Sequence, residues 1–133
     1  MRRAATLAGR LVAAALATLA ISALPSLSEN PESEIEHLLS YVEQSGCTFI
    51  RNDKDYTASR ARSHLERKYS YAKSKIDNAD QFIEYVGAGS SRSGKLYRIR
   101  CGEHEYPAGE WLAAELSRFR ASLNPPAGET SGG

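Results

Sequence analysis

The chain has 133 residues, of which 41% are hydrophobic, 25% charged and 8% aromatic. This length suits one small domain and excludes a multi-domain enzyme or a long array of repeats. Seventeen Lys and Arg side chains stand against sixteen Asp and Glu, so there is no strong charge bias, and two cysteines are too few for an all-cysteine zinc site or an iron–sulfur cluster.

The first 24 residues combine the three parts of a secretory signal peptide. Arg2, Arg3 and Arg10 make a basic start, and residues 11–24 are uncharged, mostly apolar and end in small side chains. This run is short for a membrane span, which needs about 20 residues, so a retained anchor helix is the less favoured alternative. We expect residues 1–24 to be a cleaved signal peptide and the mature chain to be periplasmic or secreted, with no transmembrane segment.

Loss of this leader changes the charge balance, because it removes three arginines and no acidic residue. Fourteen basic side chains then stand against sixteen acidic ones. The mature chain therefore has no overall attraction to nucleic acid, and we expect no nucleic-acid partner.

A helix is predicted at the start of the mature chain. Asn30 is a suitable N-cap, with Pro at the first helical position, and Gly46 ends the helix. The apolar positions that share one face are Ile35, Leu38, Leu39 and Val42. Residues 47–51 are rich in strand-forming side chains, residues 52–55 resemble a turn, and Tyr56 begins a short return strand.

Two helices are predicted in the middle of the chain. Thr57 is a suitable N-cap for the first of them, which runs to about Ile76 with apolar side chains on one face. Asp77 and Asn78 break it, and a shorter helix carries the apolar side chains of residues 82–86.

A further strand and a last helix are predicted in the C-terminal part. Residues 95–101 alternate as a strand, and residues 102–105 are expected to form a turn. The side chains expected on one face of the strand are Tyr97, Ile99 and Cys101, with Arg98 and Arg100 on the other. Pro107 begins a helix. Residues 123–133 hold no core-forming side chain and are predicted to be a disordered tail, which leaves residues 29–122 as the domain.

Two stretches of the chain resemble each other weakly. The run Ile-Arg followed by Tyr-Thr-Ala at residues 50–58 is similar to Ile-Arg followed by Tyr-Pro-Ala at residues 99–108, and each opens a helix. Each half can be interpreted as a helix, a short strand or hairpin, and a second helix. We predict a small α+β domain in which about four helices pack with one small antiparallel sheet.

The two cysteines are predicted to form a structural disulfide, because exported chains fold where disulfides persist. If the strands run antiparallel with Cys47 opposite Cys101, then Phe49 lies opposite Ile99 and the apolar pairs share one face. This bridge would stabilise the fold by roughly 4 kcal/mol in the chain-entropy model. A redox-active pair is the less favoured alternative, because no Cys-x-x-Cys spacing is present.

Residues 89–95 match most of a phosphate-binding loop, with a glycine at each end of the variable part and a lysine after the second. Leu96 stands where a Ser or Thr is required, and a predicted helix precedes the loop while a strand follows it, the reverse of the required order. A Ser/Gly-rich connector is the favoured interpretation. We expect no cofactor, and no metal site either, because the three histidines are widely separated.

The predicted helix after Thr57 is locally basic, with Glu66 as its one opposing acid. Its basic residues are Arg60, Arg62, Arg67, Lys68, Lys73 and Lys75. A solvated helix face is favoured over a patch for an anionic partner, because these charges need not share one face.

Distinctive short runs occur along the mature chain. They are Cys-Thr-Phe-Ile-Arg-Asn at residues 47–52, Tyr-Thr-Ala at 56–58, Ala-Asp-Gln-Phe-Ile at 79–83 and Ser-Ser-Arg-Ser-Gly-Lys-Leu-Tyr-Arg-Ile at 90–99. Together they resemble the YfeK-like family of small exported bacterial proteins of unknown function. The resemblance covers about residues 35–118 and implies an envelope location and a compact domain. It supplies no catalytic residues.

The predicted function is that of a non-enzymatic binding or accessory module, whose partner is an envelope protein or an anionic envelope component. Its expected contact surface is the polar loop with nearby basic side chains, because loops on rigid scaffolds often carry function. The candidate binding residues are Ser90, Ser91, Ser93, Gly94, Lys95, Tyr97, Arg51, Arg98 and His64. The alternative is a small hydrolase of an envelope polymer with His64 as base, which requires a cleft where His64 reaches a Ser, a Tyr or a carboxylate.

Overall fold

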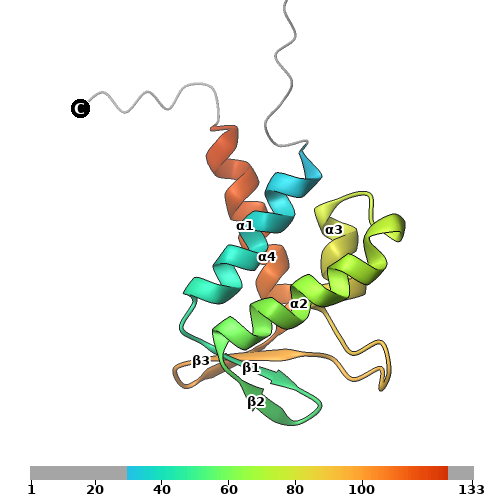
Figure 1. Cartoon of the computed structure of the whole chain (residues 1–133). Helices are drawn as coiled ribbons and strands as arrows, with labels where there is room; N and C mark the ends of the chain where they lie inside the picture. Colours follow the sequence, from blue (N-terminus) through green and yellow to red (C-terminus); the bar gives the residue numbers. More distant parts are fainter. Residues whose placement is uncertain (1–29, 126–133) are drawn as a thin grey trace, which may run out of the picture.

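The computed structural model describes residues 30–125. The predicted signal peptide at residues 1–24 and residues 126–133 of the predicted tail lie outside the described part. A four-stranded antiparallel sheet, ordered β2-β1-β3-β4, carries the helices on one face (Figure 1). The described chain is thus an α+β domain in which helices α1 to α4 pack on a small antiparallel sheet, and the predicted fold class is confirmed.

Helix α1 and the first hairpin make up the beginning of the domain. Their bounds are Pro31–Gln44 for α1, Thr48–Arg51 for β1 and Lys54–Tyr56 for β2. The Asn30 side chain caps α1, as predicted, by accepting two backbone N–H groups at 3.1 and 3.2 Å. Asn52 and Asp53, with φ of 50° and 64°, form a two-residue turn. This tight turn starts the return strand at Lys54, two residues before the predicted Tyr56.

Helix α2 and two shorter helical segments follow the first hairpin. Their bounds are Ala58–Ala72 for α2, Lys73–Lys75 for the 3-10 segment η2, Ala79–Phe82 for α3 and Ile83–Gly87 for the π-helical segment η3. The Thr57 hydroxyl caps α2, as predicted. The α-helix ends earlier than predicted, because η2 tightens its last turn and leaves Ile76 in extended backbone, packed into the core.

The second hairpin and the last helix complete the domain. Their bounds are Arg98–Cys101 for β3, His104–Pro107 for β4 and Ala108–Leu123 for α4. The turn predicted at residues 102–105 is shorter, because only Gly102 and Glu103 lie between the paired strands and Gly102 has a φ of 65°. All four residues of β4 are exposed, so they lack the alternation that identifies a half-buried strand.

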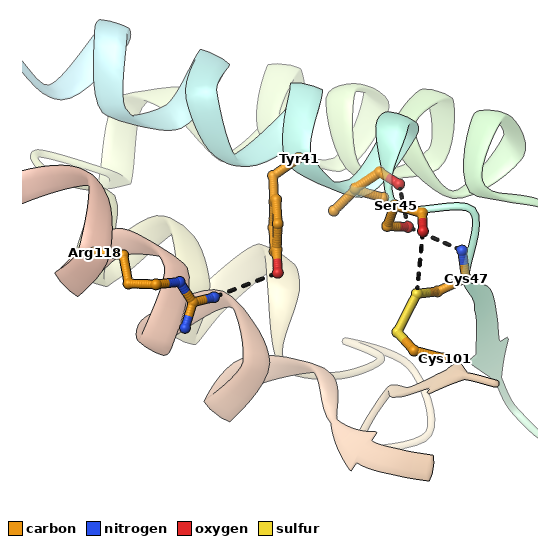
Figure 2. The surroundings of a disulfide bond; sticks show 6 residues. Tyr41, Ser45, Cys47, Cys101 and Arg118 are labelled. Atoms are coloured by element: carbon orange, nitrogen blue, oxygen red, sulfur yellow. Dashed lines mark hydrogen bonds between the residues drawn. A yellow bond between two sulfur atoms is a disulfide. The ribbon is translucent and has the colours of Figure 1, made fainter. Parts of the chain in front are cut away.

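Strands β1 and β3 pair at the centre of the sheet, with Phe49 opposite Ile99 as predicted. Cys47 and Cys101 follow in this register and form a disulfide, with their Cα atoms 4.6 Å apart. Figure 2 shows that the chain enters this bridge directly from the end of α1, where the Ser45 hydroxyl accepts the backbone N–H of Cys47 at 3.1 Å. The disulfide thereby fixes the two central strands to one another beside α1.

The outer face of the sheet is charged and its ion pairs run across the strands. Arg98 pairs with Glu105 of β4 at 2.5 Å, and Arg100 pairs with Asp55 of β2 at 3.1 Å. The predicted alternation is confirmed, because Ile99 between these arginines is 1% exposed and lies on the helix-covered face.

Ion pairs also join the helices over the core. Arg62 of α2 pairs with acids of α1 and of its own helix, namely Glu36, Glu43 and Glu66. Arg120 of α4 reaches the buried Glu34 of α1 at 2.6 Å and Asp80 of α3 at 2.9 Å. Within residues 30–125, no helix is both long enough and apolar enough to cross a membrane.

Candidate functional site

Arg51 leaves the end of β1 on the helix-covered face of the sheet, and its guanidinium lies against α2. Its Nη1 atom is 2.7 Å from His64 Nδ1 and 3.0 Å from His64 Nε2, and Nη2 donates to the Tyr56 hydroxyl at 3.0 Å. His64 Nε2 is also 3.1 Å from the hydroxyl of Tyr97, whose side chain is buried. The first hairpin, α2 and the segment before β3 therefore meet in one polar cluster.

The partners of His64 determine its charge. A guanidinium can only donate, and Arg51 Nη1 lies within hydrogen-bond distance of both ring nitrogens, so the lone pair of the neutral imidazole faces Arg51 in either tautomer. Burial, followed by the positive charges of Arg51, Lys68 and Arg67, lowers the pKa of His64 from 6.5 to about 4. His64 is therefore a neutral link in this cluster at pH 7.

Lys68 is a half-buried cation whose hydrogen bonds go to neutral oxygens. Its Nζ atom donates to the carbonyl oxygens of Val86 and Gly89 at 3.0 and 2.7 Å, and to the Tyr97 hydroxyl at 3.2 Å. Burial, followed by repulsion from Arg51, lowers the pKa of Lys68 from 10.5 to about 8. The lysine ties α2 to the end of η3 and to the loop before β3, and it remains mostly charged at pH 7.

Two adjoining cavities flank this cluster. The hairpin cavity, of about 280 Å³, lies between the first hairpin and α2, and the central cavity, of about 440 Å³, lies between α2 and the loop before β3. Arg51, His64 and Arg67 line both. The central cavity is also lined by Asn52, Lys68, Tyr71, Ser90, Ser91, Arg92 and Tyr97. Among the residues that the structure describes, no Asp or Glu lines either cavity.

The basic side chains around these cavities differ from those elsewhere in the domain. In the part of the chain that the structure describes, no ion pair within 4.0 Å forms at Arg51, Arg60, Arg67, Lys68 or Arg92. Arginines on other faces pair with carboxylates: Arg62, Arg98, Arg100, Arg118 and Arg120. The cavities therefore concentrate positive charge that the protein itself does not neutralise, which is the environment an anion requires.

The predicted binding residues fall into two groups. Those that line the central cavity are Arg51, His64, Ser90, Ser91 and Tyr97. Ser93 and Lys95 instead reach the turn of the first hairpin, where Ser93 Oγ donates to Asn52 Oδ1 at 2.6 Å and Lys95 Nζ lies 2.8 Å from Asp53 Oδ2. These two contacts fasten the loop to the hairpin, so they position the rim of the cavity.

Gly94 and Arg98 also lie away from the cavities. Gly94 has a φ of 72°, which lets the loop turn, and its backbone N–H donates to the Ser90 carbonyl at 2.9 Å. Arg98 is on the outer face of the sheet with Glu105. The structure thus gathers the predicted residues from β1, α2 and the first part of the loop into one site, and separates the rest from it.

The predicted site does not include Arg67, Lys68 or Arg92, although all three line the central cavity. Arg67 and Lys68 lie three and four positions after His64, so they share its helix face. Their spacing from His64 could therefore have identified Arg67 and Lys68 as site residues from the sequence. Arg92 has no such signal, because its place depends on how the loop folds back on the hairpin.

Residues 89–95 do not form a phosphate-binding loop of the P-loop type. The helical segment η3 precedes them and β3 follows, and the exposed side chain of Leu96 occupies the position that needs a hydroxyl. Within residues 30–125, no group of three His, Cys, Asp or Glu side chains is close enough to hold a metal ion.

The fold and its cavities define a small disulfide-bonded α+β domain with an acid-free basic site. The sequence pattern of a family of unknown function (DUF5329) matches residues 29–120, and the chain belongs to this family. The uncharacterized protein YfeK of Salmonella typhimurium is 33% identical to it over 90 residues, which are 66% of this chain and 75% of that relative. The resemblance to the YfeK-like family is confirmed. No solved structure matches the chain significantly.

Proposed function

We propose that the protein is a binding module of the bacterial envelope that holds an anionic group in the central cavity. The proposal rests on one observation: within residues 30–125, basic side chains without an ion-pair partner converge on adjoining cavities that no Asp or Glu lines. Buried and half-buried charges are normally paired within a protein. An anion that enters from solution would neutralise Arg51 and Lys68, which are the half-buried cations of the site.

Each side chain of the site contributes a donor or a charge. The guanidinium groups of Arg51 and Arg67 match the oxygen pairs of phosphate, sulfate or carboxylate. The Tyr97 hydroxyl accepts a hydrogen bond from Lys68, and burial raises the pKa of Tyr97 so that the hydroxyl keeps its own hydrogen. The site therefore presents donors from several directions to one bound group.

The envelope location is part of the proposal and is supported by two features. The Cys47–Cys101 disulfide is the kind of bond that persists outside the cytosol. The first 24 residues have the pattern of an export signal. Mass spectrometry of the protein purified from its own host should find the chain without this leader and with both cysteines resistant to alkylation. An intact leader or free thiols would refute the location.

Anion binding is tested by titrating the purified protein with inorganic phosphate and following backbone amide shifts by NMR. Saturable shifts are expected at the end of β1, along α2 and at residues 90–92. Replacing Arg67 with Gln should weaken binding about tenfold, because one charge-assisted hydrogen bond is lost. Arg98→Gln is the matched control, since it removes a guanidinium from the outer face, and it should leave the affinity unchanged. Equal losses in both variants, or no saturable shift, would refute the proposal.

The alternative hydrolase has one of its requirements, because His64 lines a cavity and lies 3.1 Å from the Tyr97 hydroxyl. The chemistry of the cluster nevertheless disfavours it. A base must offer a free lone pair, whereas the donor Nη1 of Arg51 lies 2.7 Å from Nδ1 and 3.0 Å from Nε2 of His64. With a pKa of about 4, His64 is also a weak base at pH 7. The site is therefore better suited to binding than to proton abstraction.

A further inference from the structure

A third cavity extends the central cavity along α2. This tyrosine cavity, of about 290 Å³, is lined by Lys68, Tyr71, Ala72, Lys75, Tyr85 and Ser91. It shares Lys68, Tyr71 and Ser91 with the central cavity, and the central cavity shares Arg51, His64 and Arg67 with the hairpin cavity. The three cavities therefore adjoin one another along α2 as one groove, and no Asp or Glu of residues 30–125 lines it.

Helix α2 contributes Arg60, His64, Arg67 and Tyr71 to one side of the groove, and the 3-10 segment η2 that follows it adds Lys75. Steps of three and four residues keep the four α2 side chains on one face of the helix. At about 1.5 Å per residue, the distance from Arg60 to Tyr71 is roughly 16 Å, and Lys75 lies beyond Tyr71. A groove of this length exceeds what one phosphate group or one sugar unit can fill.

The chemistry of the groove changes along its length. The hairpin and central cavities are rich in cations, whereas the far end carries two exposed aromatic rings. Tyr71 is 85% exposed and Tyr85 is 52% exposed, in contrast to the 2% of Tyr97 in the core. Exposed aromatic rings can pack against a flat apolar face of a ligand, while neighbouring lysines bind the charged groups of the same ligand.

We propose that this groove binds a linear anionic polysaccharide, with its charged groups held by Arg51 and Arg67 and its sugar rings packed on Tyr71 and Tyr85. The inference rests on the proposed anion binding in the central cavity and assigns a class of ligand to it. One observation favours a sugar polymer over nucleic acid. The Cys47–Cys101 disulfide is the kind of bond that persists outside the cytosol, where nucleic acid is scarce.

The ligand class is tested with galacturonic acid and its linear oligomers of increasing length, measured by isothermal titration calorimetry. The dissociation constant should fall about tenfold or more between the monomer and an oligomer that spans the groove, because each added contact is made within one complex. Neutral galactose oligomers of the same lengths should bind at least about tenfold more weakly. Oligothymidylate of matched charge is the nucleic-acid probe, and it should bind more weakly than the acidic sugar oligomers.

A pair of tyrosine variants locates the contact. Tyr85→Ala should reduce the gain of affinity with oligomer length by about tenfold and leave the affinity for inorganic phosphate unchanged, because Tyr85 lines the tyrosine cavity and not the central cavity. Tyr106→Ala is the matched control, because Tyr106 is also exposed, at 42%, but lies on β4 outside the groove. It should change neither affinity.

The outcomes separate this inference from the proposed function. If phosphate binds but affinity does not rise with oligomer length, the polysaccharide groove is wrong and the anion site stands. If oligothymidylate binds more tightly than the sugar oligomers, the ligand is a nucleic acid and the polysaccharide assignment is wrong. If neither phosphate nor any acidic oligomer binds, both proposals fail.

Discussion

The two hairpin–helix units of the domain, β1–β2–α2 and β3–β4–α4, share a plan. Tyr56 lies opposite Phe49 in the first hairpin, Tyr106 lies opposite Ile99 in the second, and each hairpin turns through two residues. Because Phe49 also pairs with Ile99, the two hairpins join into one sheet through equivalent positions. The single small antiparallel sheet that the sequence predicts is confirmed.

The position before the turn shows how the two units differ. It is Arg51 in the first hairpin and Cys101 in the second. Arg51 contacts His64 and lines two cavities, whereas Cys101 is bonded to Cys47. Within residues 30–125, the basic residues of the first unit that face the cavities form no ion pair, and the arginines of the second unit pair with acids. The same plan thus carries basic cavities in one unit and ion pairs with a disulfide in the other.

The largest expected effect tests the stabilising contribution of the second unit. Replacing both cysteines with serine should lower the free energy of unfolding by roughly 4 kcal/mol, because the bridge between residues 54 positions apart no longer restricts the unfolded chain. Urea titration measures this loss, and phosphate affinity of the folded protein should be unchanged. Equal stability of the wild-type protein with and without reductant would contradict the expectation.

The next effect concerns the ion pair that joins α4 to α1. Arg120→Met should lower the free energy of unfolding by about 3 kcal/mol, because Glu34, which is 2% exposed, would keep its charge without a partner. Arg118→Met is the control, since Arg118 pairs with Glu115 at the surface, and it should cost less than about 1 kcal/mol. Similar losses in the two variants would show that burial of Glu34 does not matter.

A smaller effect tests the neutral His64 of the first unit. In the unfolded chain its pKa is the ordinary 6.5, and in the folded chain it is about 4. As the pH falls through this window, the unfolded chain takes up a proton that the folded chain does not, so stability falls by about 1–2 kcal/mol, with allowance for solvent screening of this half-buried group. Urea titrations at several pH values should show that His64→Gln lacks this loss. Parallel pH profiles of the two proteins would contradict the prediction.

The smallest effect links Lys68 to binding. Its pKa of about 8 means that the central cavity loses a positive charge as the pH rises through this value, so sulfate affinity should fall several-fold between about pH 7 and pH 9. Sulfate is the suitable probe, because its own charge is constant in this range. Lys68→Met should bind more weakly and show a flat profile. A flat profile in the wild-type protein would place the bound anion away from Lys68.

Local features of the fold could be predicted because neighbouring residues decide them. Asn30 and Thr57 cap their helices through atoms two or three residues away. The register of Phe49 against Ile99 follows from burial of apolar side chains on one face. Strand β4 could not be identified in the same way, because its exposed residues gain their structure from pairing with β3.

The weak similarity between the two hairpins predicts one pair of equivalent positions correctly and another pair wrongly. Tyr56 and Tyr106 are equivalent in the two hairpins, as the sequence suggests. Ile50 and Ile99 are not, because Phe49 occupies the position that corresponds to Ile99. Identical residue types in two stretches do not show which positions are equivalent in the strands until the number of residues in each turn is known. A shift of one residue in the register moves a side chain to the opposite face of the sheet.

The sequence by itself determined the helix caps, the apolar faces, the disulfide and the family, because these depend on short-range geometry and on which side chains avoid water. Only the tertiary structure decided which cations are neutralised. Arg62 faces the acids of α1, while Arg67, five residues later on the same helix, faces cavities that hold no acid. The reason is that the energy of a charge depends on the distance through space to other charges and to water, and packing sets both.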